Sequence, residues 1–137
     1  MTELGALEMI VRPYTDADLE ALRAMHSAQG FSYALPDPAD PLLLVREVVE
    51  EQGRPRMAAL LRLTAEAYLL ADPGDGAPRE RWQWLAALHE AAHRAAAARG
   101  LADVQAFLPP RVARAFGRRL AQLGWRRDPW PCYAKIL

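Results

Sequence analysis

The sequence has few of the features that cross-link small secreted domains or anchor proteins in membranes. Its single cysteine, Cys132, cannot form a disulfide within the chain, which fits a reducing compartment. No apolar run approaches the length that crosses a bilayer, and the opening MTELGALEMIVR lacks the basic start and apolar centre of a signal peptide. We therefore expect a soluble, cytoplasmic protein without a membrane partner.

Lysine is also scarce, because sixteen of the seventeen basic residues are arginine. Together with abundant alanine this indicates a coding bias, so we expect no nucleic-acid partner. The formal net charge is zero, but residues 1–75 carry 13 acidic and 6 basic side chains, whereas residues 76–137 carry 4 and 11. This asymmetry indicates either two mutually attracting faces or an anion site in the second half.

The length and composition predict one globular domain. A chain of 137 residues with 52% hydrophobic content can bury a core without disulfides or metals. We assign residues 1–8 to an N-terminal extension and residues 9–137 to a single domain.

Hydrophobic periodicity and Gly/Pro punctuation predict alternating strands and helices. Three prolines make residues 31–41 a loop, and three strands within 42–72 are expected to form an antiparallel meander. The helices are expected over residues 16–28, 78–99 and 111–123, and the strands over 9–12, 43–51, 57–63, 68–70, 103–108, from 125, and over 133–137.

Three stretches at matching intervals resemble the GCN5-related N-acetyltransferase (GNAT) superfamily. MIVRPYTDADLEAL is similar to its opening strand and helix, VVEEQGRPRMAALLRL to its central hairpin, and RRLAQLGW to its closing helix. The resemblance extends over residues 9–137. It implies an α/β fold with a mixed, mostly antiparallel sheet flanked by helices, splayed between its fourth and fifth strands, with acetyl-CoA in the gap.

The stretch DPGDGAPRERW, residues 72–82, stands where the family binds the cofactor's diphosphate. The family pattern of Gln or Arg, two residues, Gly, one residue, and Gly or Ala is absent, because bulky residues replace the glycines that let amides approach a phosphate. The resemblance places the cofactor beside Leu70 and Asp72. Arg79 and Arg81 could bind its phosphates through their guanidinium groups, unless neighbouring acidic residues neutralise them.

The family's catalytic residues are only partly represented. Glu66 resembles the position of a general-base glutamate, and the alternative is a solvated charge at a strand end. The tyrosine that often serves as general acid four residues before the closing Gly-aromatic pair is Leu120 here, which cannot donate a proton. An asparagine often found before the last helix is missing from LPPRV.

A second motif, His89-Glu90-Ala91-Ala92-His93, matches the zinc-peptidase pattern H-E-x-x-H. Histidines four apart on a helix share a face and could bind zinc, with Glu90 activating water. Zinc needs a third ligand, and downstream of His93 there is no histidine or glutamate to provide it. Asp103, Asp128 or Cys132 would have to serve. The alternative, which we favour, places His89 at the border of the core and His93 in solvent, with no metal.

Two functions from different classes remain. The first is an acetyl-CoA-dependent N-acetyltransferase with a degenerate cofactor loop, acting on a small-molecule or peptide amine. The second is a non-catalytic GNAT-like binding or assembly module that does not bind coenzyme A. Its protein partner would meet an exposed tryptophan, the arginine-rich last helix or the proline-rich loop 36–41. A zinc peptidase is the minor third reading.

Overall fold

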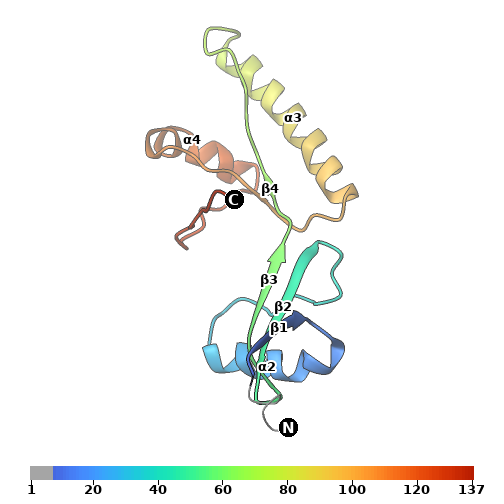
Figure 1. Ribbon diagram of the computed structural model, residues 1–137. Helices are drawn as coiled ribbons and strands as arrows, with labels where there is room; N and C mark the ends of the chain where they lie inside the picture. Colours follow the sequence, from blue (N-terminus) through green and yellow to red (C-terminus); the bar gives the residue numbers. More distant parts are fainter. Residues whose placement is uncertain (1–7) are drawn as a thin grey trace. The chain divides into compact units, whose positions relative to one another are not determined.

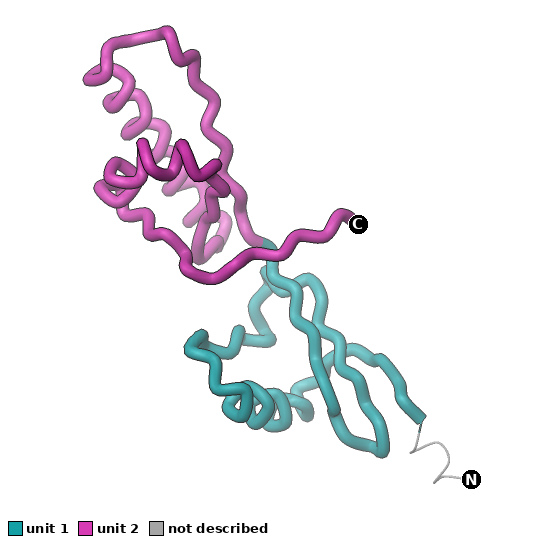
Figure 2. The backbone as a smooth tube through the Cα atoms, turned by 90° about the vertical axis from the view of Figure 1, so that its left-hand side faces the viewer, with its two compact units in different colours: residues 1–63 teal, residues 64–137 magenta. Residues whose placement is uncertain are grey.

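The computed structural model describes residues 8–137 and has a mixed α/β composition with an antiparallel sheet (Figure 1). The chain divides into two compact units, residues 1–63 and residues 64–137, coloured separately in Figure 2. A single domain over residues 9–137 stays a prediction, and the extension 1–8 lies outside the described residues except for Glu8.

The first unit consists of three strands and a helix that begins as a 3-10 turn. Thr15 is extended and precedes the turn, and Gly30 ends the helix in the left-handed conformation with φ 72°, as the sequence predicts. The elements are β1 (Ile10–Pro13), η1 (Asp16–Asp18), α2 (Leu19–Gln29), β2 (Leu43–Glu51) and β3 (Arg54–Arg62).

The sheet of this unit is antiparallel in the order β1-β2-β3. Its hairpin turn is Gln52-Gly53, with φ values of 56° and 70°, the conformation that two-residue hairpins require. From the sequence, the turn between these two strands is expected at Gly53-Arg54-Pro55, one position later than observed. Val48 of β2 is fully buried, and Leu43 of β2 and Leu22 of α2 are buried as well.

A buried carboxylate joins β1 to the start of the helix. Asp18 is 3% exposed and accepts two hydrogen bonds from Arg12, at 2.7 and 2.8 Å, and one from the Thr15 amide at 2.9 Å. Arg12 also reaches Glu50 of β2 at 3.3 Å. The Arg12 hydrogen bonds lower the pKa of Asp18 to about 2, so the carboxylate is ionised and paired at neutral pH.

The second unit contains two short strands and two longer helices. Ala65 pairs with Val104 and Glu66 with Gln105 in parallel, and the Ala67 amide donates to the Gln105 carbonyl at 2.7 Å. Each helix has a proline in its first turn, where the missing N–H is not needed. The elements are β4 (Ala65–Glu66), α3 (Pro78–Ala98), β5 (Val104–Gln105) and α4 (Pro110–Gln122).

Several predicted strands are wrong. Residues 68–70 are not a third meander strand; the pairing lies at β4 and is parallel to β5. The strand predicted over 103–108 shrinks to two residues, and the described residues from 125 and over 133–137 form no strand. An alternating pattern indicates an extended segment but cannot choose its partner, and the prolines of LPPRV and DPWPC withhold ladder donors.

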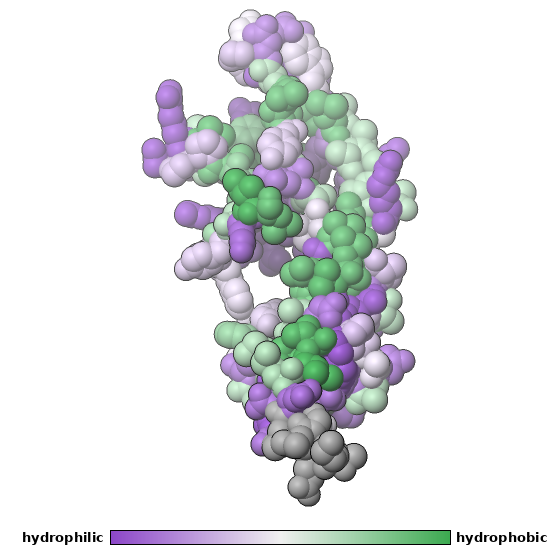
Figure 3. All heavy atoms as spheres, viewed as in Figure 1, coloured by the Kyte–Doolittle hydropathy of each residue, from purple (hydrophilic) through white to green (hydrophobic). Residues whose placement is uncertain are grey.

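The apolar stripes of α3 and α4 are less buried than the sequence predicts. Among the described residues neither helix has a buried one, and Leu88, expected in the core, is 58% exposed. Figure 3 shows apolar residues, in green, on the visible surface. Amphipathic spacing predicts an apolar face but does not say what covers it. No described helix is long and apolar enough to cross a membrane.

Candidate functional site

The candidate site is a cleft of about 480 Å³ within the second unit. One wall is the segment that follows β4, including Leu70 and Asp72, and the others are the first half of α3 and one face of α4. Trp82 and Phe116 supply aromatic surface from the two helices. The size and mainly apolar lining are typical of small-ligand pockets.

Arg119 of α4 lines this cleft and contacts Trp82 of α3. Its guanidinium carbon lies 5.4 Å from the centre of the Trp82 ring, a cation–π contact between the two helices. The sequence predicts that Trp82 and Trp84 lie on different sides of α3. Trp82 is half-buried at this contact, and Trp84 is 46% exposed.

The loop before α3 closes on itself through an Asx-type turn. Asp72 accepts a hydrogen bond from the Gly74 amide at 2.9 Å through its carboxylate, and one from the Asp75 amide at 3.2 Å through its carbonyl. Two of the amides that a phosphate would need are thereby already paired within the loop.

Side chains from the first turn of α3 complete this closure. The Glu80 carboxylate accepts the Ala77 amide at 3.0 Å and so places a negative charge at the positive end of the helix. Arg81 donates to the carbonyl oxygens of Asp72 and Asp75, at 2.6 and 2.7 Å. Its contact is with backbone oxygens and not with the neighbouring carboxylates.

The indole of Trp84 covers the one glycine of the loop with a left-handed backbone. Gly76 has φ 81°, and a methyl group built on its Cα would stand 2.5 Å from Cη2 of Trp84. Trp84 therefore occupies the space that the missing side chain of Gly76 leaves open. In a phosphate loop that space is what lets the ligand approach the backbone.

The predicted cofactor residues are brought together only in part. Leu70, Asp72 and Arg81 line the cleft, whereas Arg79 is exposed and is not among its lining residues. Glu66 lies in β4, outside the lining, paired with Gln105. The Glu66 carboxylate raises the pKa of Tyr68.

The H-E-x-x-H histidines have separate surroundings. His89 is half-buried, and its Nε2 accepts the indole N–H of Trp125 at 2.9 Å, while His93 is exposed. Glu90 pairs with Arg94 at 2.8 Å. Among the described residues no three His, Cys, Asp or Glu side chains gather as metal ligands.

The Trp125–His89 bond ties the segment after α4 to α3, and this predicts a difference between the two histidines. His89→Ala is expected to lower the free energy of unfolding by about 1–3 kcal/mol, since the half-buried indole N–H loses its acceptor. His93→Ala should change it by less than about 0.5 kcal/mol, as an exposed substitution. Urea unfolding followed by tryptophan fluorescence measures both, and equal losses would contradict the assignment.

Three contributors to this unit were missed by sequence reasoning. Nothing in the sequence indicated that Trp84 contacts Gly76, because Gly76 lies before α3, Trp84 lies within it, and residues eight positions apart need not meet. Tyr68 was read only as part of a strand, although its i+2 spacing from Glu66 in extended chain places both on one side. The His89–Trp125 contact, over 36 positions, is visible only in the tertiary structure.

Known proteins offer no relative from which to transfer a function. No family model matches the chain, and no curated protein or solved structure shows significant similarity to it.

Proposed function

We propose that this chain is a divergent GNAT-like protein that serves as a non-catalytic binding module and does not seat coenzyme A in the loop before α3. The observation that carries the proposal is the closure of that loop by its own side chains. Glu80 holds the Ala77 amide, and Trp84 covers Gly76. Leu120 in place of the general-acid tyrosine points the same way.

The GNAT-like part of the proposal rests on the resemblance of the three sequence stretches. Three antiparallel strands precede a parallel pair that joins only two residues of β4 and β5. Short pairing of this kind fits a sheet that opens beyond the paired residues, as the resemblance implies. The described residues contain fewer strands than the GNAT layout.

The ligand or partner of the module is expected in the cleft between α3, α4 and the segment after β4. Trp82 and Phe116 offer apolar surface there, with Arg119 beside it. An apolar group next to an oxyanion suits this lining, because apolar walls with few polar groups combine affinity with orientation.

Titration with acetyl-CoA tests the loss of the cofactor site. We expect no saturable heat and no rise in melting temperature at millimolar acetyl-CoA, because a ligand specific for the folded state would stabilise it by mass action. Arg119→Ala, which alters the cleft but not the loop, is the matched control for non-specific binding. Saturable binding that Arg81→Ala weakens and Arg119→Ala leaves intact would overturn the proposal.

An N-acetyltransferase that binds its cofactor in an unusual way is the second candidate, and the effect of Glu66 on the pKa of Tyr68 favours it. A carboxylate that can take a proton from an amine lies beside a hydroxyl that can donate one. Incubation with acetyl-CoA and a mixture of amines would then release free thiol. That release should disappear in Glu66→Gln and persist in Glu90→Gln, whose carboxylate is exposed on α3.

A further inference from the structure

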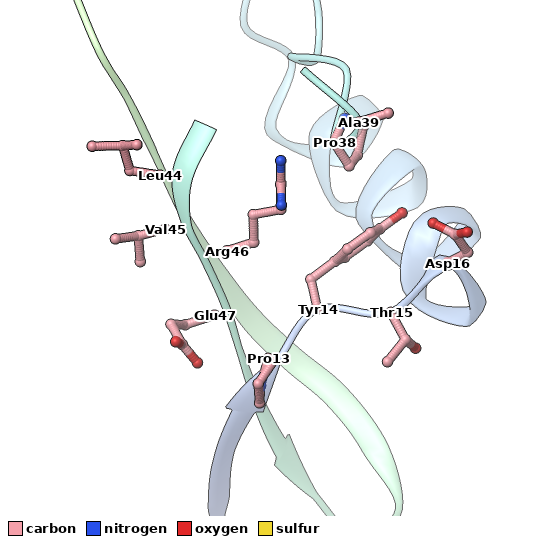
Figure 4. Close-up of a pocket in the computed structure, with 10 residues that line it drawn as sticks. All are labelled: Pro13, Tyr14, Thr15, Asp16, Pro38, Ala39, Leu44, Val45, Arg46 and Glu47. Atoms are coloured by element: carbon pink, nitrogen blue, oxygen red, sulfur yellow. The ribbon is translucent and has the colours of Figure 1, made fainter. Parts of the chain in front are cut away.

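A separate cleft of about 660 Å³ lies in the first unit, where β2 continues past the end of β1 (Figure 4). The two strands pair as far as Pro13 and Glu47, and the Tyr14 amide then donates to the Arg46 carbonyl at 3.0 Å. Beyond that bond the chain turns into η1, and Pro38 and Ala39 form the opposite wall. The cleft belongs wholly to residues 13–47 and is independent of the proposed module.

Arg46 lines this cleft with a guanidinium that is short of acceptors. It is half-buried, and its Nη2 donates a hydrogen bond to the Asp40 carbonyl oxygen at 3.0 Å. Its Nε is closed off from water and has no hydrogen-bond partner. Among the described residues no carboxylate oxygen lies within 4.0 Å of its nitrogens. A buried donor without a partner is uncommon and calls for an explanation.

Arg12, in the same unit, is an arginine whose guanidinium is paired with carboxylates. Arg12 pairs with Asp18 through two hydrogen bonds and with Glu50 through a third. Half-buried cations in folded proteins are normally paired in this way. The contrast leaves the charge of Arg46 available to a ligand in the cleft that Arg46 lines.

Tyr14 provides a second donor in the cleft. In Figure 4 its side chain and that of Arg46 both project toward Pro38 and Ala39. Burial and the nearby carboxylates of Asp16 and Asp18 raise the pKa of Tyr14. The hydroxyl therefore stays protonated at neutral pH and can donate to an oxyanion.

The acidic residues of the cleft restrict which anion can bind. Asp16 lies on the Tyr14 side of the cleft, and Glu47 lines it from the other side of the strand, pointing away from Arg46 (Figure 4). With the Asp16 carboxylate beside its one cation, the cleft disfavours a doubly charged phosphate more than a singly charged carboxylate. It tolerates a carboxylate and attracts an accompanying ammonium group.

We propose that this cleft binds a small zwitterion of the amino-acid type. Its carboxylate lies on the Arg46 guanidinium and the Tyr14 hydroxyl, and its ammonium group lies toward Asp16. The apolar surface of Pro38 and Ala39 takes an aliphatic side chain. Arginine is suited to this role because its planar fork matches a carboxylate.

Calorimetry with three related probes tests the charge requirement. L-leucine is expected to bind with saturable heat at millimolar concentration. L-leucinamide, which lacks the carboxylate, and N-acetyl-L-leucine, which lacks the ammonium group, should each bind about tenfold more weakly or worse. Absence of heat with L-leucine, equal binding of all three probes, or tighter binding of inorganic phosphate would overturn the proposal.

Substitution of Arg46 tests the residue. Arg46→Met should abolish L-leucine binding without lowering the melting temperature, because an unpaired charge is removed. Arg54→Met, at an exposed arginine of β3 outside the cleft, is the matched control and should bind L-leucine like the native chain. If Arg46→Met does not fold, Arg46→Lys should fold and bind about tenfold more weakly, since the fork is lost. Undiminished L-leucine binding in the Arg46 variant that folds would overturn the proposal.

Discussion

Alanine in place of Gly76 is expected to destabilise the second unit by about 2–5 kcal/mol. Two costs add: an L-residue with φ 81° loses about 1–2 kcal/mol, and overpacking costs about 1–3 kcal/mol. The overpacking is specific, because the added methyl group would lie 2.5 and 2.7 Å from two carbons of the Trp84 ring. All four tryptophans lie within residues 64–137, so urea unfolding followed by their fluorescence reports this unit.

Gly100 provides the matched control for this prediction. Its φ is 78°, and a methyl group built there meets nothing within 4 Å. Gly100→Ala should therefore show only the backbone cost of about 1–2 kcal/mol. Combining Gly76→Ala with Trp84→Ala should recover the steric part, as coupled neighbours do in a double-mutant cycle. Equal losses for Gly76→Ala and Gly100→Ala would show that Trp84 does not rest on the loop.

Asparagine in place of Asp18 is expected to destabilise the first unit by about 3 kcal/mol, since breaking a buried ion pair leaves its partner uncompensated. The substitution removes the negative charge and one of the two oxygens that accept hydrogen bonds from Arg12, and the amide nitrogen in its place faces other donors. Far-UV circular dichroism during urea unfolding is the suitable measurement, because the unit has no tryptophan.

The control for Asp18 is Glu20, whose carboxylate pairs with Arg23 but is 83% exposed. Glu20→Gln should change the free energy of unfolding by less than about 0.5 kcal/mol, as exposed i,i+3 pairs do. A loss at Glu20 as large as that at Asp18 would mean that burial does not decide the effect.

The lowered pKa of Asp18 also predicts that the free energy of unfolding decreases at acid pH. Its pKa is about 2 in the folded chain against an ordinary 3.8, so the folded state favours the ionised form. The stabilisation is complete above about pH 4 and is lost as the pH falls toward 2, amounting to about 2 kcal/mol. Unfolding measured at a series of pH values should show this loss in the native chain. The Asp18→Asn chain should lack this part of the pH dependence. The same loss of stability at acid pH in both chains would contradict the prediction.

The loop before α3 illustrates why part of the candidate site could be located from the sequence. Pro78 at the first helical position and the glycines before it correctly predicted a turn and the start of a helix, because these residues act through local backbone chemistry. The departure from the phosphate-loop pattern was also visible. Which groups would replace the missing amide contacts was not, since Glu80, Arg81 and Trp84 could point in several directions.

The pairing of the strands could be predicted from the sequence only in part. The hairpin of β2 and β3 was predictable, because a two-residue turn and alternating side chains specify an antiparallel neighbour. The segment after β3 alternates similarly but pairs in parallel with β5, nearly 40 positions away. Parallel pairing needs a crossover, here including α3, and nothing within a short window encodes it.

The sequence by itself determined where this chain is helical, where it turns, and that the stretch before α3 departs from the GNAT pattern, because these depend on residues within a few positions of each other. Only the tertiary structure decided which strands pair, which arginine has a carboxylate and which does not, and which indole covers Gly76. Those outcomes depend on contacts between distant residues, where burial and hydrogen-bond satisfaction outweigh local propensity.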